Sequence, residues 1–247
     1  MSFALRQQIP AVNATTGDST SSTASQSLPS TANAGNLLIL TAYTNSGTSL
    51  AISGTGATKA FSTDLIVNNT GTTRFNMWWK IAGGTEKTYT LTVTGGSPTV
   101  TRFHIYEFTK SSSGLYNVAI SATGASTAPA TAVRSDAFYD EYLAFSSIGY
   151  SGASTTFSNS GGLYSAQGNG FTGTETQLVD FYYATANTNI VSQQAKLTAA
   201  ASRSWAMGTL IFYSNPYSAQ LGISLGLTGT FTIVNASSSN YPTLGVG

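Results

Sequence analysis

The fold is decided by one stretch of sequence, Arg74-Phe75-Asn76-Met77-Trp78-Trp79-Lys80-Ile81-Ala82, because a similar stretch follows 104 positions later. The second stretch is Leu178-Val179-Asp180-Phe181-Tyr182-Tyr183-Ala184-Thr185-Ala186. Both have a heavy aromatic pair at their centre, and aromatic residues are enriched in β strands. The repeat therefore predicts two equivalent strands in two similar halves.

Other parts of the chain extend this repeat. The run Leu37–Tyr43 is continuously apolar and bounded by turn residues, which predicts a strand covered on both faces. A similar run, Tyr142–Ile148, follows 105 positions later, and Phe108 lies 104 positions before Phe212. We expect an all-β fold, a two-sheet antiparallel β sandwich that is jelly-roll-like, within residues 35–215. Its halves are predicted at about 35–110 and 140–214, because a sheet with an apolar face needs another sheet to cover it.

The composition favours strands and disfavours several classes of partner. Only 8% of the residues are charged, about a third of the usual share. Ser, Thr, Asn and Gly are abundant instead, and they suit strands and turns better than helices. The net charge is +1 and the basic residues are scattered, so no nucleic-acid partner is expected. A surface so poor in charge has little electrostatic resistance to self-association.

Both ends of the chain have a different character from the middle. Residues 1–34 predict a short N-terminal strand or arm and a polar linker, the alternative being an arm that orders on a neighbouring subunit. Residues 216–247 predict a C-terminal β arm with two short strands. We expect this arm to pair with a sheet edge of another subunit, although it could instead complete the sandwich. The candidate intersubunit residues of this arm are Leu221, Ile223, Leu225, Leu227, Phe231 and Ile233.

Several kinds of chemistry find no support in the sequence. There is no cysteine, so disulfides and thiolate metal sites are excluded. The first residues contain neither a basic leader nor a signal-peptide core, and no apolar run approaches a membrane span. We expect a protein made in a cytoplasm, whatever its final location, with no membrane partner.

The candidate catalytic residues are few. The single histidine, His104, lies inside a predicted strand, and no motif supplies it with a nucleophile and a carboxylate. The densest acidic cluster, Asp136, Asp140 and Glu141, matches no calcium-loop spacing and suits a solvated turn. We therefore expect no enzymatic activity, no metal and no cofactor.

The aromatic strand offers the best candidate for recognition. If Phe75 and Met77 face the core, strand alternation turns Trp78 outward among polar neighbours, where it could stack on a sugar ring. Alternatively, another element or a subunit interface covers Trp78 and its repeat partner. The candidate binding residues are Arg74, Asn76, Trp78 and Lys80, with Asp180 and Tyr182 at the repeated positions.

A family resemblance adds to these inferences. It rests on a polar lead-in, on Ala34-Gly35-Asn36-Leu37-Leu38-Ile39, on an aromatic strand that ends at Ala82-Gly83-Gly84, and on Tyr89-Thr90-Leu91-Thr92-Val93 with Ile105-Tyr106-Glu107-Phe108. Over residues 8–214 this order resembles a β-sandwich domain that recurs in bacterial surface proteins and bacteriophage virion proteins. The resemblance transfers no catalytic residue.

The resemblance implies a structural protein of a tailed bacteriophage virion. We expect a capsid decoration, or cement, protein that binds copies of itself as a homo-oligomer and the major capsid or other virion proteins. The alternative is a tail or fibre receptor-binding component, or a carbohydrate-binding module or adhesin that binds a host surface glycan through Trp78. A hydrolase is the least favoured class.

Overall fold

The computed structural model describes residues 3–9, 18–19, 21–53, 56–110, 115–133, 141–152, 157–159, 177–186 and 194–214. All of them belong to a unit that spans Met1–Pro216, whereas the predicted C-terminal arm lies outside the described residues. The described residues form strands and turns, so the expected all-β class is confirmed. None of them lies in a helix that could cross a membrane.

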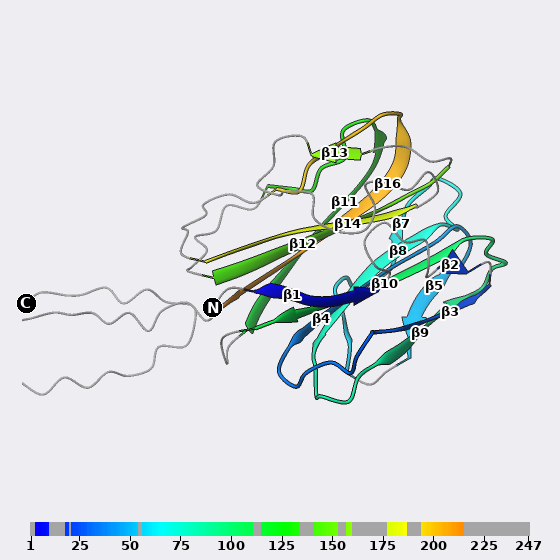
Figure 1. Ribbon diagram of the computed structural model, residues 1–247. Helices are drawn as coiled ribbons and strands as arrows, with labels where there is room; N and C mark the ends of the chain where they lie inside the picture. Colours follow the sequence, from blue (N-terminus) through cyan, green and yellow to red (C-terminus); the bar gives the residue numbers. More distant parts are fainter. Residues whose placement is uncertain are drawn as a thin grey trace, which may run out of the picture. The chain divides into compact units, whose positions relative to one another are not determined.

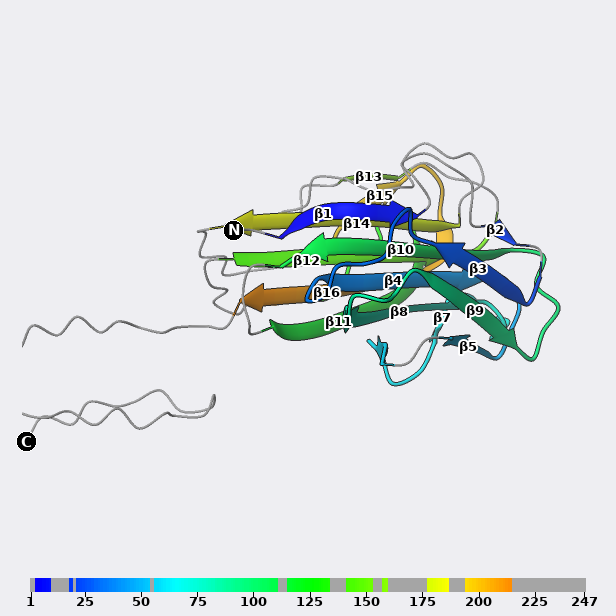
Figure 2. The same ribbon diagram turned by 60° about the horizontal axis from the view of Figure 1, so that its bottom comes forward.

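Two antiparallel sheets form the centre of the sandwich (Figure 2). The first has the order β1 (Ala4–Ile9), β10 (Thr101–Thr109), β4 (Leu37–Thr44) and β8 (Arg74–Ile81). Three short strands extend it: β2 (Asp18–Ser19) pairs with β10, while β6 (Thr58–Lys59) and β7 (Leu65–Ile66) pair with β8. The second has the order β11 (Leu115–Ser126), β16 (Arg203–Ser214), β12 (Glu141–Tyr150) and β14 (Leu178–Ala186).

Two small sheets complete the described strands (Figure 1). One contains β3 (Thr23–Ser27), β9 (Thr88–Thr94) and β5 (Ser49–Ile52), and it packs on the outer face of the first central sheet. The other pairs β13 (Phe157–Asn159) with β15 (Leu197–Ala199), and β15 packs on the outer face of the second central sheet. The sequence predicted only two sheets. The two small outer sheets are the main difference between that prediction and the structure.

Strand β4 lies between two cores. Leu37, Ile39 and Tyr43 point into the core between the central sheets, whereas Leu38 and Leu40 point into the core beneath the small β3–β9–β5 sheet. All eight residues of β4 are buried. The prediction of a strand covered on both faces is therefore confirmed, and both covers belong to this chain.

The two central sheets share one strand order and one register. In the first sheet Ile39 pairs with Trp79, and in the second Phe145 pairs with Tyr182. These residues all face the core between the sheets. When these two pairs are matched, Ile39 corresponds to Phe145 and Trp79 to Tyr182. Residues of β12 thus lie 106 positions after their equivalents on β4, and residues of β14 lie 103 positions after their equivalents on β8. The offsets of 105 and 104 read from the sequence are thus each wrong by one residue.

The strands β10 and β16 are a third equivalent pair, and their pairing agrees with the match between β4 and β12. Leu37 pairs with Phe108, and its equivalent Leu143 pairs with Phe212. The offset of 104 between Phe108 and Phe212 therefore matches the register. Because strand side chains alternate between faces, an error of one residue on β8 exchanges the inner and outer faces.

The described part of residues 1–34 belongs to the sandwich. β1 pairs with β10 at the edge of the first central sheet, and β3 pairs with β9 in the small sheet. Phe3 is buried in the central core, and Leu28 is buried in the core of the small sheet. The stretch expected to be a strand or arm followed by a polar linker thus contributes strands and core residues.

Candidate functional site

A buried polar cluster links the two central sheets. Asp180 on β14 accepts hydrogen bonds at Oδ2 from three side chains of the first sheet. The donor atoms are Nδ1 of His104 at 2.5 Å, the hydroxyl of Tyr106 at 2.8 Å and Oγ1 of Thr41 at 3.2 Å. Asp180 is 0% exposed and His104 is 2% exposed.

The chemistry available to this cluster is limited by its burial. A carboxylate beside Nδ1 of a histidine is the arrangement that orients a catalytic base. Here, however, the imidazole and the carboxylate both lie between two packed sheets, and a substrate needs access to the base. The cluster instead joins the sheets through a buried carboxylate with three donors, which is costly to break.

The partner of His104 was missed in the sequence. His104 and Asp180 are 76 residues apart, and no local motif connects them. A weak signal was available, because Asp180 is the only charged residue of its strand, and His104 has aromatic and apolar neighbours in a strand that also carries Arg102 and Glu107. Two such residues on inner faces need each other, since a buried charge must be paired.

A second buried carboxylate ties the N-terminal strand to the first sheet. Glu107 on β10 is 0% exposed and accepts bonds from Arg6 and Gln7 of β1. It also accepts from the backbone N–H of Asn33 at 2.9 Å and from Nδ2 of Asn36 at 2.6 Å. Burial alone would raise the pKa of Glu107, but these donors together lower it below its ordinary value.

Two further carboxylates hold loops of the first half. Asp64 accepts from the backbone N–H of Leu50 at 2.7 Å, from Nδ2 of Asn76 at 2.6 Å and from Lys59 at 2.6 Å. Glu86 forms an ion pair with Lys80 at 2.7 Å and closes the turn at Gly83–Gly84 through backbone N–H groups. Every carboxylate whose side chain is described therefore has a structural partner.

No metal centre is formed by the described residues. They contain no group of three or more His, Cys, Asp or Glu side chains that could hold an ion. Of the acidic cluster seen in the sequence, Asp136 and Asp140 lie outside the described residues. Glu141 begins β12, but its side chain also lies outside the description.

The predicted recognition strand is covered. Trp78 is 4% exposed and Asn76 is 0% exposed, because the β3–β9–β5 sheet and the Asp64 loop cover this face of β8. The expectation that they project outward is wrong, and the alternative of cover by another element is correct. Nothing in this geometry supports a sugar-stacking role for Trp78, since the stacking face must be accessible.

The other predicted binding residues are not brought together at one surface. Arg74 and Lys80 are half-buried on β8, where Lys80 pairs with Glu86. Asp180 and Tyr182 lie on the side of β14 that faces the first central sheet, so they are not equivalent to Asn76 and Trp78. Tyr182 packs edge-on against Phe108, with ring centroids 5.0 Å apart. The six arm residues proposed from Leu221 to Ile233 lie outside the described residues.

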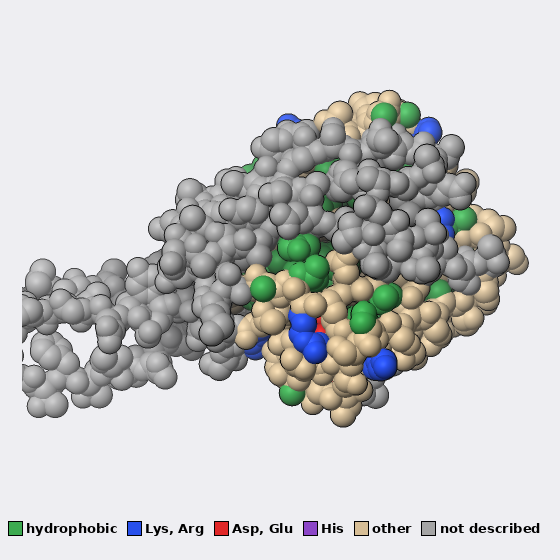
Figure 3. All heavy atoms as spheres, in the orientation of Figure 1, with side chains coloured by type: hydrophobic (Ala, Val, Ile, Leu, Met, Phe, Trp, Pro, Cys, Tyr) green, Lys and Arg blue, Asp and Glu red, His purple; other side chains and the backbone are tan. Residues whose placement is uncertain are grey.

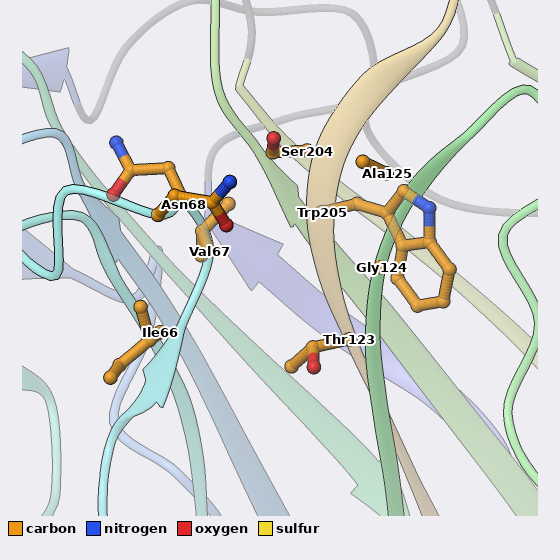
Figure 4. A pocket seen from close by; sticks show the side chains of 9 residues that line it. Ile66, Val67, Asn68, Thr123, Gly124, Ala125, Ser204 and Trp205 are labelled. Atoms are coloured by element: carbon orange, nitrogen blue, oxygen red, sulfur yellow. The ribbon is translucent and has the colours of Figure 1, made fainter.

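A hollow of about 310 Å³ lies where the loop after β7 meets β11 and β16 (Figure 4). Asn68, Asn69 and Thr123 contribute polar groups to its wall. The indole of Trp205 lies across Gly124, and its Nε1 donates to Ser126 at 3.2 Å. Figure 4 shows this ring on the opposite side of β11 from Ile66 and Asn68, so the ring does not face them across the hollow.

Comparison with known proteins returns no similarity: no family model, curated protein or solved structure matches this chain.

Proposed function

We propose that this chain is a structural protein of a tailed bacteriophage virion, bound to the capsid exterior as a decoration protein. The proposal is carried by one observation: the only histidine and all four carboxylates with described side chains serve internal bonds. Such use of the ionisable groups suits a scaffold whose function is its own shape and its contacts. The virion assignment rests on the resemblance in sequence order.

The character of the surface supports the same proposal. Figure 3 shows a face on which Lys and Arg side chains occupy a few separate places among polar and backbone atoms. With 8% charged residues and a net charge of +1, the chain meets a like-charged neighbour with little repulsion. A decoration protein would bury this surface across capsomer junctions, and binding only the assembled shell would stabilise it by mass action.

Immunogold electron microscopy on particles purified from the source culture tests the proposal. The antibody is raised against this chain, and excess free protein serves as the competitor in the control. Regular label over the head is the expected result. Label restricted to the tail tip would replace decoration with receptor binding, and particles without label would overturn the virion assignment.

The C-terminal segment provides a second test. Deletion of residues 216–247 is expected to leave a folded sandwich, because the three described cores lie before Pro216. If the segment is an intersubunit arm, the shortened chain should lose most of its binding to particles. Thermal unfolding by circular dichroism checks the fold, and co-sedimentation with particles checks the binding. A shortened chain that no longer folds would assign the segment to the sandwich.

A further inference from the structure

Strand β11 is a long edge strand. It pairs with β16 along all 12 of its residues without a register shift. No other described strand pairs with its opposite edge. In an antiparallel strand, alternate residues direct their N–H and C=O groups to the same side, so about half of these backbone groups face outward. The edge can therefore accept a further strand.

The other described edges of the central sheets are short or carry features that discourage strand addition. β1 has a register shift between Leu5 and Gln7, and it carries Arg6. β14 carries Asp180 on its inward face. On the far side of the first sheet, β6 and β7 contain two residues each. Bulges, inward charges and shortness are the devices by which natural sheets protect their edges.

β11 has none of these devices. The sequence from Leu115 to Val133 contains no charged residue, and its single proline, Pro129, follows the end of the strand. The exposed side chains on one face are small: Ala119, Ser121 and Thr123. A strand that is long, uncharged and without a bulge is a template for pairing, and such an edge left open invites aggregation.

One large hydrophobic side chain beside this edge is exposed. Ile66 is 50% exposed, and only one other large hydrophobic residue among those described is as exposed. Ile66 and Thr123 line the same hollow, with the Thr123 side chain directed to the space between β7 and β11 (Figure 4). Ile66 is therefore exposed at the same hollow as the exposed face of β11.

We propose that β11 pairs antiparallel with β11 of a second copy of this chain across a two-fold axis. The pairing joins the second central sheets of the two copies into one continuous sheet. It goes beyond the proposed function, because it assigns a self-association surface that does not require a virion.

Two arguments favour a second copy over a foreign peptide. A two-fold contact is isologous, so both open edges are satisfied at once, whereas a single bound peptide covers only one. In such a contact residue i of one copy lies opposite residue j of the other, and j lies opposite i, so the strand has to be compatible with its own sequence, and like charges directly opposite one another are destabilising. An uncharged strand meets this condition, whereas recognition of a charged partner would call for complementary charge on β11.

Sedimentation velocity on the full chain tests the proposal. Wild type at tens of micromolar is expected to sediment as a dimer of two 25.6 kDa chains. The variant Ser121→Lys/Thr123→Lys adds like charges to the exposed face of β11, and its dissociation constant should rise about tenfold. The matched control is Thr92→Lys/Thr94→Lys, because both threonines are exposed on β9, a strand with partners on both sides.

A charge-exchange experiment separates pairing from a general loss of fold. The variant Ser121→Glu/Thr123→Glu should also dimerise more weakly alone, and mixing it with the lysine variant should restore a dimer that contains one of each. Far-ultraviolet circular dichroism checks that each variant is folded. A monomeric wild type overturns the proposal. So does a wild-type dimer that both β11 variants leave unchanged, or a mixture that stays monomeric.

Discussion

The two central sheets have the same strand order and register, yet they are stabilised differently. All the donors that bond to the described carboxylates lie within residues 3–110, which also contain Asp64, Glu86 and Glu107. The one described carboxylate of the second half, Asp180, also finds its donors on the first sheet. The second sheet depends on apolar packing and small residues.

Two glycines show how the second sheet accommodates the first. Gly149 occupies the position equivalent to Tyr43, and Gly208 occupies the position equivalent to His104. A Cβ atom on Gly149 would lie 2.9 Å from the Tyr43 ring, and one on Gly208 would lie 2.6 Å from the Phe61 ring. Bulky residues of the first half thus face glycines of the second central sheet. A repeat that forms both halves of one core has to diverge at such positions, because equal bulk on both sides would collide.

The largest expected effect comes from breaking the polar link between the sheets. Asp180→Ala removes the acceptor of His104, Tyr106 and Thr41 in the buried interface. Loss of one partner from a buried charged cluster lowers the free energy of unfolding by about 3–5 kcal/mol. Urea unfolding followed by tryptophan fluorescence measures the loss.

A conservative variant gives this experiment its control. Asp180→Asn keeps the shape and one carbonyl acceptor, so it should lose clearly less stability than Asp180→Ala. If Asp180→Ala costs below about 1 kcal/mol, the cluster is not a significant link between the sheets. Such a result would leave the apolar core as the main connection between the halves.

An intermediate effect is expected from bulk added to the second sheet. In Gly208→Ala the new methyl group would lie 2.6 Å from Cζ of Phe61 and 2.8 Å from Sδ of Met77. Overpacking of this kind costs about 1–3 kcal/mol. The control is Gly83→Ala, where the nearest atom is Oε1 of Glu86 at 3.4 Å. Equal unfolding midpoints for the two variants would show that the sheets adjust without cost.

The sequence predicted the class of the fold and most long strands, because the signals lie within single strands. The run Leu37–Tyr43 indicated cover on both faces without a partner being known. Trp78 was misplaced because alternation on β8 shows only which residues share a face, and it does not show that β9, the next strand along the chain, folds back over that face. The offset of the repeat was wrong by one residue for a related reason, since similar aromatic residues occur on both faces of β8 and β14. The pairing of His104 with Asp180 required the packing of two sheets, which no local pattern encodes.

The smallest expected effect concerns the ion pair between Lys80 and Glu86 at the Gly83–Gly84 turn. It tests whether a charged link of the first half contributes to stability in a way that the apolar packing of the second half does not. Burial would raise the pKa of Glu86, but Lys80 and the backbone N–H groups of the turn lower it to about 2. Because the folded pKa lies below the unfolded value of about 4.3, the contribution of Glu86 is complete above that value and is lost as the pH falls toward 2. Glu86→Gln should therefore cost about 1 kcal/mol or less at pH 7, and the difference from wild type should shrink below pH 4.3. Urea unfolding midpoints of both proteins from pH 7 to pH 3 measure this convergence, and a difference independent of pH would show that the turn does not depend on the charge of Glu86.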